Sequence, residues 1–170
     1  NENTKYLDDL KNVTFISFTN KLIDNPKNVI SAGVNAISQL RTIKKFNDNN
    51  SNSRSIILIP KSEFKKEIEE AINKTNIKYK EVFYYDREPT KLTKQIEDLT
   101  KYQARKNNLK NEIKRIESLS FKDKEKRIKN LKTKDTIGNI DFDSVIIADF
   151  DENLKSVATS LLYTDVSPNK

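Results

Sequence analysis

The stretch that most constrains the fold is 141–162, where a short apolar run leads directly into a pattern with helical spacing. The run 145–148 (VIIA) is continuously apolar, as expected of a central strand in a parallel sheet with both faces covered. Asp149 and Asp151 follow at the end of this strand, where binding sites gather in α/β sheets. The apolar residues beyond them predict a helix: Leu154, Val157, Ala158, Leu161 and Leu162.

The earlier part of the chain shows the same alternation of short apolar strands and amphipathic helices. Four strands are predicted, at 13–18, 29–32, 55–59 and 81–85. Asn35 is predicted to cap a helix that continues to about Phe46, and Ser62 to cap the helix between the last two of these strands. This alternation predicts a mainly parallel sheet with right-handed crossovers.

A long helical segment then interrupts the alternation. From about Thr90 the helical pattern runs to Leu119, which gives roughly 30 residues or ~45 Å of helix. After Ser120 a shorter helix begins. We therefore expect a helical hairpin at about 90–134 that projects from the sheet and is held together by facing apolar stripes. The stripes are Leu109, Ile113 and Ile116 on the first helix and Phe121, Ile128 and Leu131 on the second.

The net charge of +7 comes from this hairpin segment. Residues 101–134 contain 13 Lys and Arg against 4 Asp and Glu, whereas the rest of the chain contains 19 against 21. Three interpretations of the basic face are open: a solvated surface, a binding site for a polyanion or an anionic membrane, and an arm that docks to another protein. The candidate docking residues are Arg105, Lys106, Lys110 and Arg127.

The composition excludes several classes of chemistry. With no Cys and no His, the chain can form no disulfide, no reactive thiolate and no His-ligated metal site. We predict no cofactor, no metal and no transmembrane span, since no apolar run reaches the roughly 20 residues that a spanning helix needs. The abundance of Asn, Lys and Ile makes the basic charge a weak indicator, so nucleic acid is not an expected partner. The absence of Met indicates a cut or processed chain.

A pair of aspartates resembles a catalytic motif. The segment VIIADFDENL is similar to the first motif of the haloacid-dehalogenase phosphotransferases, in which the first Asp attacks phosphorus and both coordinate Mg²⁺. That resemblance would make Asp149 the nucleophile and Asp151 its partner. Only 21 residues follow Asp149, which leaves no room for the later motifs of that family. We therefore favour an acidic helix N-terminus that satisfies its own backbone amides, and we expect no catalytic residue.

Two further strand ends could contribute to a binding site. Ser17, Thr19 and Asn20 lie at the end of the first strand, and their short polar side chains could hold a ligand or shape a turn. Tyr84 and Tyr85 end the fourth strand, where their hydroxyl groups could line a cleft. One Tyr on each face of a sheet is also ordinary packing.

The order of the segments resembles a known fold. FISFTN, NVISAGV before a helix, SIILIPKSEF, EVFYYD, a long charged helix, TIGNIDFDSVIIAD and LLYTDVSP follow one another as in the second half of the type I periplasmic-binding fold. More narrowly, the chain resembles the penicillin-binding protein activator (LppC/LpoA-like) lipoproteins, in which KYQARKNNLKNEIKRIESL looks like a characteristic insertion. The resemblance implies a strand and crossover remnant of the neighbouring lobe at 1–33 and, at 34–170, a three-layer α/β lobe carrying the inserted hairpin.

The resemblance also implies where a ligand would sit. Ser17 and Thr19, with Asn20 beside them, match the hydroxyl residues that hold a ligand's carboxylate in amino-acid-binding relatives. Phe64 stands where those relatives often have Tyr, and Asp149 lies where aromatic, Gly-rich sequence commonly occurs. A site that lacks its hydrogen-bonding groups loses most of its discrimination. The resemblance therefore indicates a lobe used for contacts with proteins.

We expect a non-enzymatic bacterial cell-envelope lipoprotein that regulates peptidoglycan synthesis. It would lie in the periplasm, held by a lipid on an N-terminal part outside this sequence, and would bind an envelope protein such as a penicillin-binding protein. Two alternatives are open: a solute-binding lobe of an amino-acid-type uptake system, and a Mg-dependent phosphotransferase that uses Asp149 and Asp151. The residues leave open which protein is the partner, whether a small ligand binds, and the oligomeric state.

Overall fold

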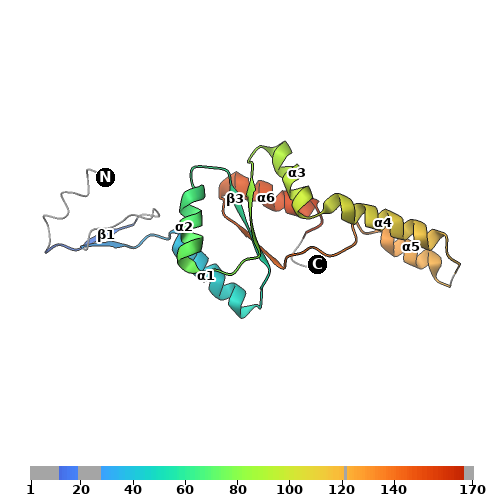
Figure 1. The fold of residues 1–170 in the computed structure, drawn as a ribbon, viewed down its shortest axis with the longest axis horizontal. Coiled ribbons are helices and arrows are strands. Elements are labelled where there is room, and N and C mark those ends of the chain that lie inside the picture. Colours follow the sequence, from blue (N-terminus) through green and yellow to red (C-terminus); the bar gives the residue numbers. More distant parts are fainter. Residues whose placement is uncertain (1–11, 19–27, 121, 167–170) are drawn as a thin grey trace. The chain divides into compact units, whose positions relative to one another are not determined.

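The computed structural model describes residues 12–18, 28–120 and 122–166. The chain forms two compact units, the first built from residues up to Ser53 together with Glu63–Lys78, and the second from Arg54–Ser62 and the residues from Tyr79 onward. The elements, labelled in Figure 1, are β1 (Phe15–Ser17), β2 (Val29–Ser31), α1 (Ala36–Asn49), β3 (Ser55–Pro60), α2 (Lys65–Thr75), β4 (Glu81–Tyr85), α3 (Pro89–Leu99), α4 (Tyr102–Glu117), α5 (Lys124–Lys132), β5 (Ser144–Ile147) and α6 (Asp151–Tyr163).

The first unit pairs β1 with β2 in parallel and packs α1 against α2. The predicted cap of α1 is confirmed: the Ser38 backbone N–H donates to Asn35 Oδ1 at 3.0 Å, and Ser38 Oγ accepts from the Asn35 backbone N–H at 3.1 Å. The predicted cap of α2 is wrong. That helix begins at Lys65, and its N-cap position is held by Phe64, whose side chain makes no capping hydrogen bond.

The second unit contains a three-stranded parallel sheet in the order β4-β3-β5. The predicted α/β fold with a parallel sheet is confirmed, and the three-layer arrangement stays a prediction. β3 is the central strand, and all six of its residues are buried. The prediction that the run 145–148 is central is wrong, because β5 pairs with β3 along one edge and lies at the end of the described sheet. An apolar run reports that the faces of a strand are covered and says nothing about its edges.

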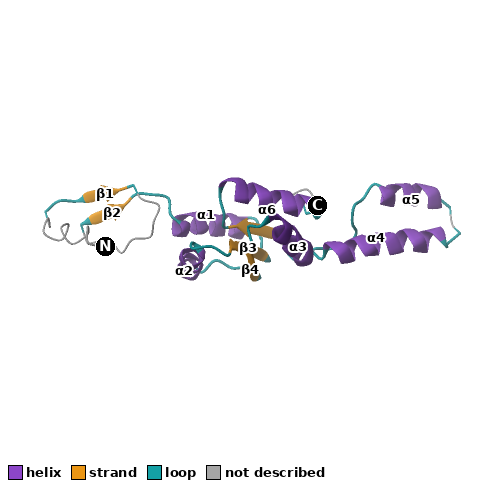
Figure 2. Ribbon diagram, turned by 90° about the horizontal axis from the view of Figure 1, so that it is seen from above, coloured by secondary structure: helices purple, strands orange, loops and turns teal. Residues whose placement is uncertain are grey.

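One face of this sheet packs against α3 and α6, which also contact each other (Figure 2). Alternate residues of β3 point to this face, as the pleat of a strand requires. These β3 residues and residues of the neighbouring elements form the core of the second unit: Ile56, Leu58, Tyr85, Leu92, Ile96, Phe142, Val157 and Leu161. No helix in the described part of the chain is both long and apolar enough to cross a membrane.

The predicted single helix from about Thr90 to Leu119 is in fact two helices. α3 ends at Leu99 and α4 starts at Tyr102, and between them Lys101 adopts the left-handed conformation with φ 53°. The apolar spacing continues across this break, so periodicity alone does not reveal it. The break separates two roles, because α3 packs in the core of the unit while α4 packs against α5.

The left-handed conformation of Lys101 generates the first prediction. An L-residue in this region costs about 1–2 kcal/mol, a cost that glycine avoids. A Lys101→Gly variant is therefore expected to keep or raise the free energy of unfolding measured by urea denaturation. Lys110→Gly, in the interior of α4, is the matched control and should lose about 1 kcal/mol. Equal losses in both variants would contradict a left-handed break at Lys101.

Candidate functional site

The carboxyl ends of β4 and β5 bring two side chains and one backbone amide together around Asp149. The Tyr85 hydroxyl donates to Asp149 Oδ2 at 2.6 Å. Arg87 donates from Nη2 to Oδ1 at 2.7 Å and from Nε to Oδ2 at 3.1 Å, and the Phe150 backbone N–H donates to Oδ1 at 2.9 Å. The Asp149 side chain is fully buried, with 0% exposure. Each carboxylate oxygen therefore already has two hydrogen-bond donors.

The electrostatics of this cluster favour a fixed ion pair. Burial raises the pKa of Tyr85 well above its usual value, and the hydrogen bond to Asp149 raises it further. Tyr85 therefore stays a neutral donor, while the charge of Asp149 is balanced by the two-point contact of Arg87. The Arg87 guanidinium also lies over the Phe150 ring, 5.6 Å from its centroid. The cluster joins the end of β4 to the segment that leads into α6.

The predicted capping role of Asp149 is wrong. Phe150 occupies the N-cap position of α6 and makes no side-chain capping bond, so Asp149 acts one residue earlier through Arg87 and Tyr85. The first turn of α6 does carry the predicted Asp151, together with a second acidic residue, Glu152. Within the described residues, no group of three or more acidic side chains is placed to hold a metal ion. The rule that strand ends meet at one edge of a parallel sheet could have linked Asp149 to Tyr85 in advance.

The other predicted cleft residues are distributed over different parts of the structure. Ser17 ends β1, and Phe64 directly precedes α2 with 38% of its surface exposed. Both belong to the first unit, whereas Asp149 belongs to the second. Thr19 and Asn20 lie outside the described residues. The ligand cleft therefore stays a prediction.

The base of the hairpin contains a buried arginine, Arg105 of α4, which is 6% exposed. Its guanidinium donates from Nη1 to the Thr164 carbonyl at 3.1 Å, and from Nη2 to Thr136 Oγ1 at 2.8 Å and to the Asp165 carbonyl at 3.2 Å. The Asp165 carboxylate lies 3.7 Å from Nη2 and also accepts from the Thr136 hydroxyl at 2.6 Å. Arg105 therefore fastens α4 to the residues that follow α6.

The prediction that Arg105 lies on the exposed docking face is wrong. Burial lowers its pKa from the usual value, yet an arginine keeps its charge in proteins, so the buried group needs the carbonyl and carboxylate partners it has. A signal was present in the sequence. Arg105 lies three residues after Tyr102 and four before Leu109, two buried residues of α4, and so shares their side of the helix.

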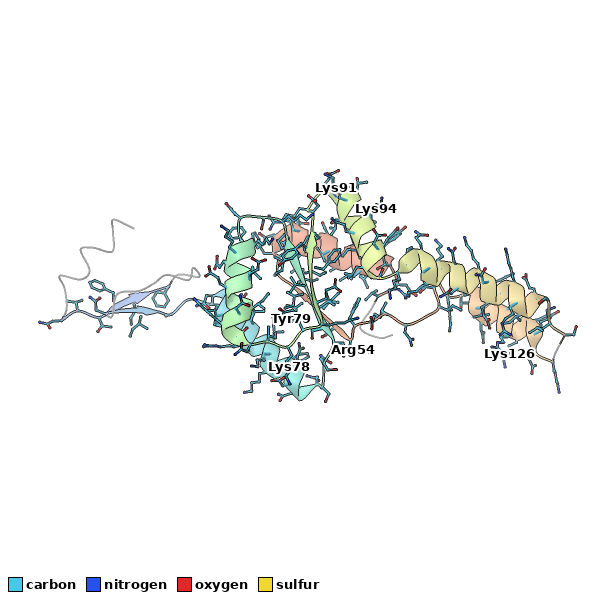
Figure 3. All side chains as sticks on the ribbon, in the orientation of Figure 1. Arg54, Lys78, Tyr79, Lys91, Lys94 and Lys126 are labelled. Carbon is cyan, nitrogen blue, oxygen red and sulfur yellow. The ribbon has the colours of Figure 1, made fainter. Side chains whose placement is uncertain are left out.

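The other predicted docking residues lie on the hairpin formed by α4 and α5, which pack side by side (Figure 3). Lys110 and Arg127 are exposed, and Lys106 is half-buried with its ammonium group 5.4 Å from the centroid of the Tyr102 ring. Arg127 also reaches across from α5 to Glu112 of α4, with 3.6 Å between Nη2 and Oε1. Of the predicted hairpin stripe, Leu109 and Ile116 are buried, and Ile113, Ile128 and Leu131 are half-buried. Phe121 lies outside the described residues.

A groove lies beside β5, bounded by the segment 136–145 and by α6, with a volume of about 1090 Å³. Its walls are mainly apolar and include Phe142 and Leu161. Small-molecule sites of this size usually combine such walls with a few convergent polar groups. Among the polar side chains that line the groove, those of Arg105, Thr136 and Asp165 already bind one another, and Arg54 pairs with Asp143 at 3.8 Å. The groove is therefore a weaker candidate for a site than the hairpin.

Removal of the Tyr85 hydroxyl should destabilise the second unit. Tyr85→Phe leaves a buried Asp149 with one donor fewer and is expected to cost about 1–3 kcal/mol in urea denaturation at neutral pH. The folded state raises the pKa of Tyr85. The Tyr85 hydroxyl therefore contributes to the free energy of unfolding below the unfolded-state pKa of about 10, and this contribution is lost as pH rises above that value. The difference between wild type and Tyr85→Phe should therefore shrink between about pH 9 and 11. The control is Tyr79→Phe, at an exposed tyrosine. A difference in the free energy of unfolding between wild type and Tyr85→Phe that does not fall with pH would contradict the hydrogen bond from Tyr85 to Asp149.

Loss of the Arg105 guanidinium should be more damaging than loss of an exposed one. Arg105→Gln removes the cation that faces Asp165 and is expected to cost about 3–5 kcal/mol, because it leaves buried partners without their charge. Arg115→Gln is the matched control: Arg115 pairs with Glu112 at the surface, and its loss should have a much smaller effect on the free energy of unfolding. Urea denaturation measures both. Similar small losses would show that Arg105 does not hold the hairpin base.

Comparison with known proteins gives this chain no relative: no family model, no curated protein and no solved structure matches it. The resemblance to penicillin-binding protein activators therefore stays a prediction from the residues, and so do the function, partners and localisation that it implies.

Proposed function

We propose that this chain is a non-enzymatic lobe that acts through protein contacts, and that the hairpin of α4 and α5 is its docking arm. The observation that carries the proposal is that the base and the distal part of the hairpin make different contacts. Its base is fastened by Arg105 to the residues after α6, while the two helices beyond the base pack on each other. The distal part of the hairpin thus contributes no residue to the core of the unit.

The charge of the hairpin supports a role in association. The segment 101–134 carries the whole positive excess of the chain, and many of its cations are exposed, including Lys110 and Arg127. Lys126 is also exposed and lies on the side of α5 that faces away from α4 (Figure 3). Exposed charge contributes little to the stability of a fold but raises the rate of encounter with a partner of opposite charge. Ordering two helices costs conformational entropy, and a contact with a partner would offset part of that cost.

The geometry at Asp149 favours this proposal over a phosphotransferase. A nucleophilic carboxylate must reach phosphorus, whereas the Asp149 side chain is fully buried and held by Arg87, Tyr85 and the Phe150 amide. Attack would first require these bonds to break. The solute-binding lobe stays the alternative within the fold. The resemblance supplies the proposed setting: a lipid-anchored periplasmic protein that regulates peptidoglycan synthesis by binding a penicillin-binding protein.

Shortening the hairpin tests the docking arm. The variant replaces 111–129 by a short Gly-rich linker between Lys110 and Asn130, so that Arg105 and Thr136 keep their contacts and the unit stays folded by circular dichroism. Surface plasmon resonance against the purified penicillin-binding proteins of the source bacterium should show binding by the full chain and loss of that binding in the shortened one.

Two outcomes would contradict the proposal. A shortened chain that binds as tightly as the full chain would show that the hairpin is not the docking arm. A full chain that binds no penicillin-binding protein would refute that class of partner. A Lys94→Gln variant on α3 serves as the folded control, because it changes an exposed cation outside the hairpin.

A further inference from the structure

The two sides of the hairpin differ in how their charges are used. On one side, Glu112 binds Arg115 of its own helix at 2.7 and 2.8 Å and Arg127 of the other helix at 3.6 Å. The hydrogen bond from Arg115 lowers the pKa of Glu112 from its usual value. This cluster places Glu112 and Arg127 on the same side of the line along which α4 and α5 meet, and there a carboxylate balances part of the positive charge.

Helix geometry places a set of lysines on the opposite side. Successive residues are about 100° apart around a helix, so the residues two positions from Glu112, Lys110 and Lys114, lie about 160° away from it. Lys129 has the same relation to Arg127 on α5. Residues three or four positions apart share a side, which adds Lys106 and Lys132. The lysine face is defined by Lys106, Lys110, Lys114, Lys129 and Lys132.

The lysine face carries unbalanced positive charge. Four of its lysines are exposed and Lys106 is half-buried, and none of the five forms an ion pair with a carboxylate in the described residues. The acidic residues on this side, Glu117 and Glu125, lie toward the tip of the hairpin. The part nearer the base therefore presents cations from both helices side by side.

Building on the proposed docking function, we propose that the lysine face binds an acidic helix of the partner protein. Lys106, Lys110 and Lys114 recur every four residues, which spaces them about 6 Å apart along α4. Glutamates one turn apart on another helix have the same spacing. A third helix laid along the line between α4 and α5 would pair its carboxylates with both lysine rows, as charged flanking positions do in coiled coils.

The chemistry of the face favours a protein over a membrane or a nucleic acid. Helices that bind membranes need large apolar side chains on the binding face, whereas Gln103 and Asn107 accompany the lysines on this side of α4. Single-stranded nucleic acids stack on aromatic side chains, and the aromatic residue of α4, Tyr102, is buried. Arginines read base edges and phosphates with two-point contacts, but Arg115 and Arg127 lie on the other side, bound to Glu112.

The test uses the full chain and a defined probe. The probe is a fluorescein-labelled, alanine-based helical peptide with Glu at every fourth position, and binding is measured by fluorescence anisotropy at 50 and 150 mM NaCl. The test variant changes all five lysines of the lysine face to Gln, a residue of similar helix propensity. The control variant makes five Lys→Gln changes at exposed positions outside the hairpin: Lys45, Lys66, Lys74, Lys78 and Lys94.

We expect the lysine-face variant to bind the peptide about tenfold more weakly than wild type, since five exposed ion pairs are lost together. The control variant, with the same net charge, should bind within about twofold of wild type. Wild-type binding should weaken at the higher salt concentration, because exposed charges are screened. Equal weakening in both variants would overturn the proposal, since total charge and not the lysine face would then set affinity.

Further binding measurements identify the class of partner. Tighter binding to vesicles of phosphatidylglycerol and phosphatidylcholine, or to a DNA oligonucleotide, with the same dependence on the five lysines would overturn the acidic helix. Equal binding of a peptide with the same composition but clustered glutamates would overturn the matched spacing. If the shortened hairpin loses the penicillin-binding protein while the lysine-face variant keeps it, the lysine face is refuted and the docking arm stands. If the shortened hairpin keeps that partner, the docking arm itself fails.

Discussion

Parallel pairing of β3 on both of its edges is the constraint on which the second unit depends. β4 and β5 both run parallel to β3, and parallel neighbours cannot be joined by a tight turn. The chain must therefore cross from the β4 edge of the sheet to the β5 edge in the segment 86–143. α3 fills the part of this crossover that covers the sheet, and its side chains enter the core. The rest of the segment forms the hairpin, which an extended crossover can carry without disturbing the strands.

Two buried charge clusters then fix α6 at its ends. Before the helix, Asp149 is held by Tyr85, the last residue of β4, and by Arg87, which follows that strand. After the helix, Thr164 and Asp165 receive the Arg105 guanidinium from the base of the hairpin. In both clusters an arginine meets oxygen atoms that are out of contact with water, so each geometry is specific and costly to break. The hairpin is thus tied to the same helix that covers the sheet.

This arrangement explains how one basic segment can have two physical roles. Arg105 is buried and serves the fold, and Glu112 with Arg115 and Arg127 forms an ion-pair cluster on one side of the hairpin. Lys110, Lys114, Lys129 and Lys132 form no ion pair in the described residues and are exposed to the solvent. A net charge summed over the segment conceals this division, since it counts a buried structural arginine and an exposed lysine alike.

The sequence by itself determined the elements that depend on local spacing. It predicted the parallel α/β pattern, the Asn35 cap of α1 and a pair of packed helices in the charged segment, because periodicity and capping involve residues a few positions apart. It did not predict the break at Lys101, since the apolar spacing continues through the turn. The tertiary structure decided that β3 is central, that Asp149 binds Arg87, and that Arg105 is buried against Thr164 and Asp165. Each of these depends on residues distant in the chain that meet when the sheet and its crossovers assemble. Helical spacing could place Arg105 on the buried side of α4, but it contains no information about which distant residues become its partners.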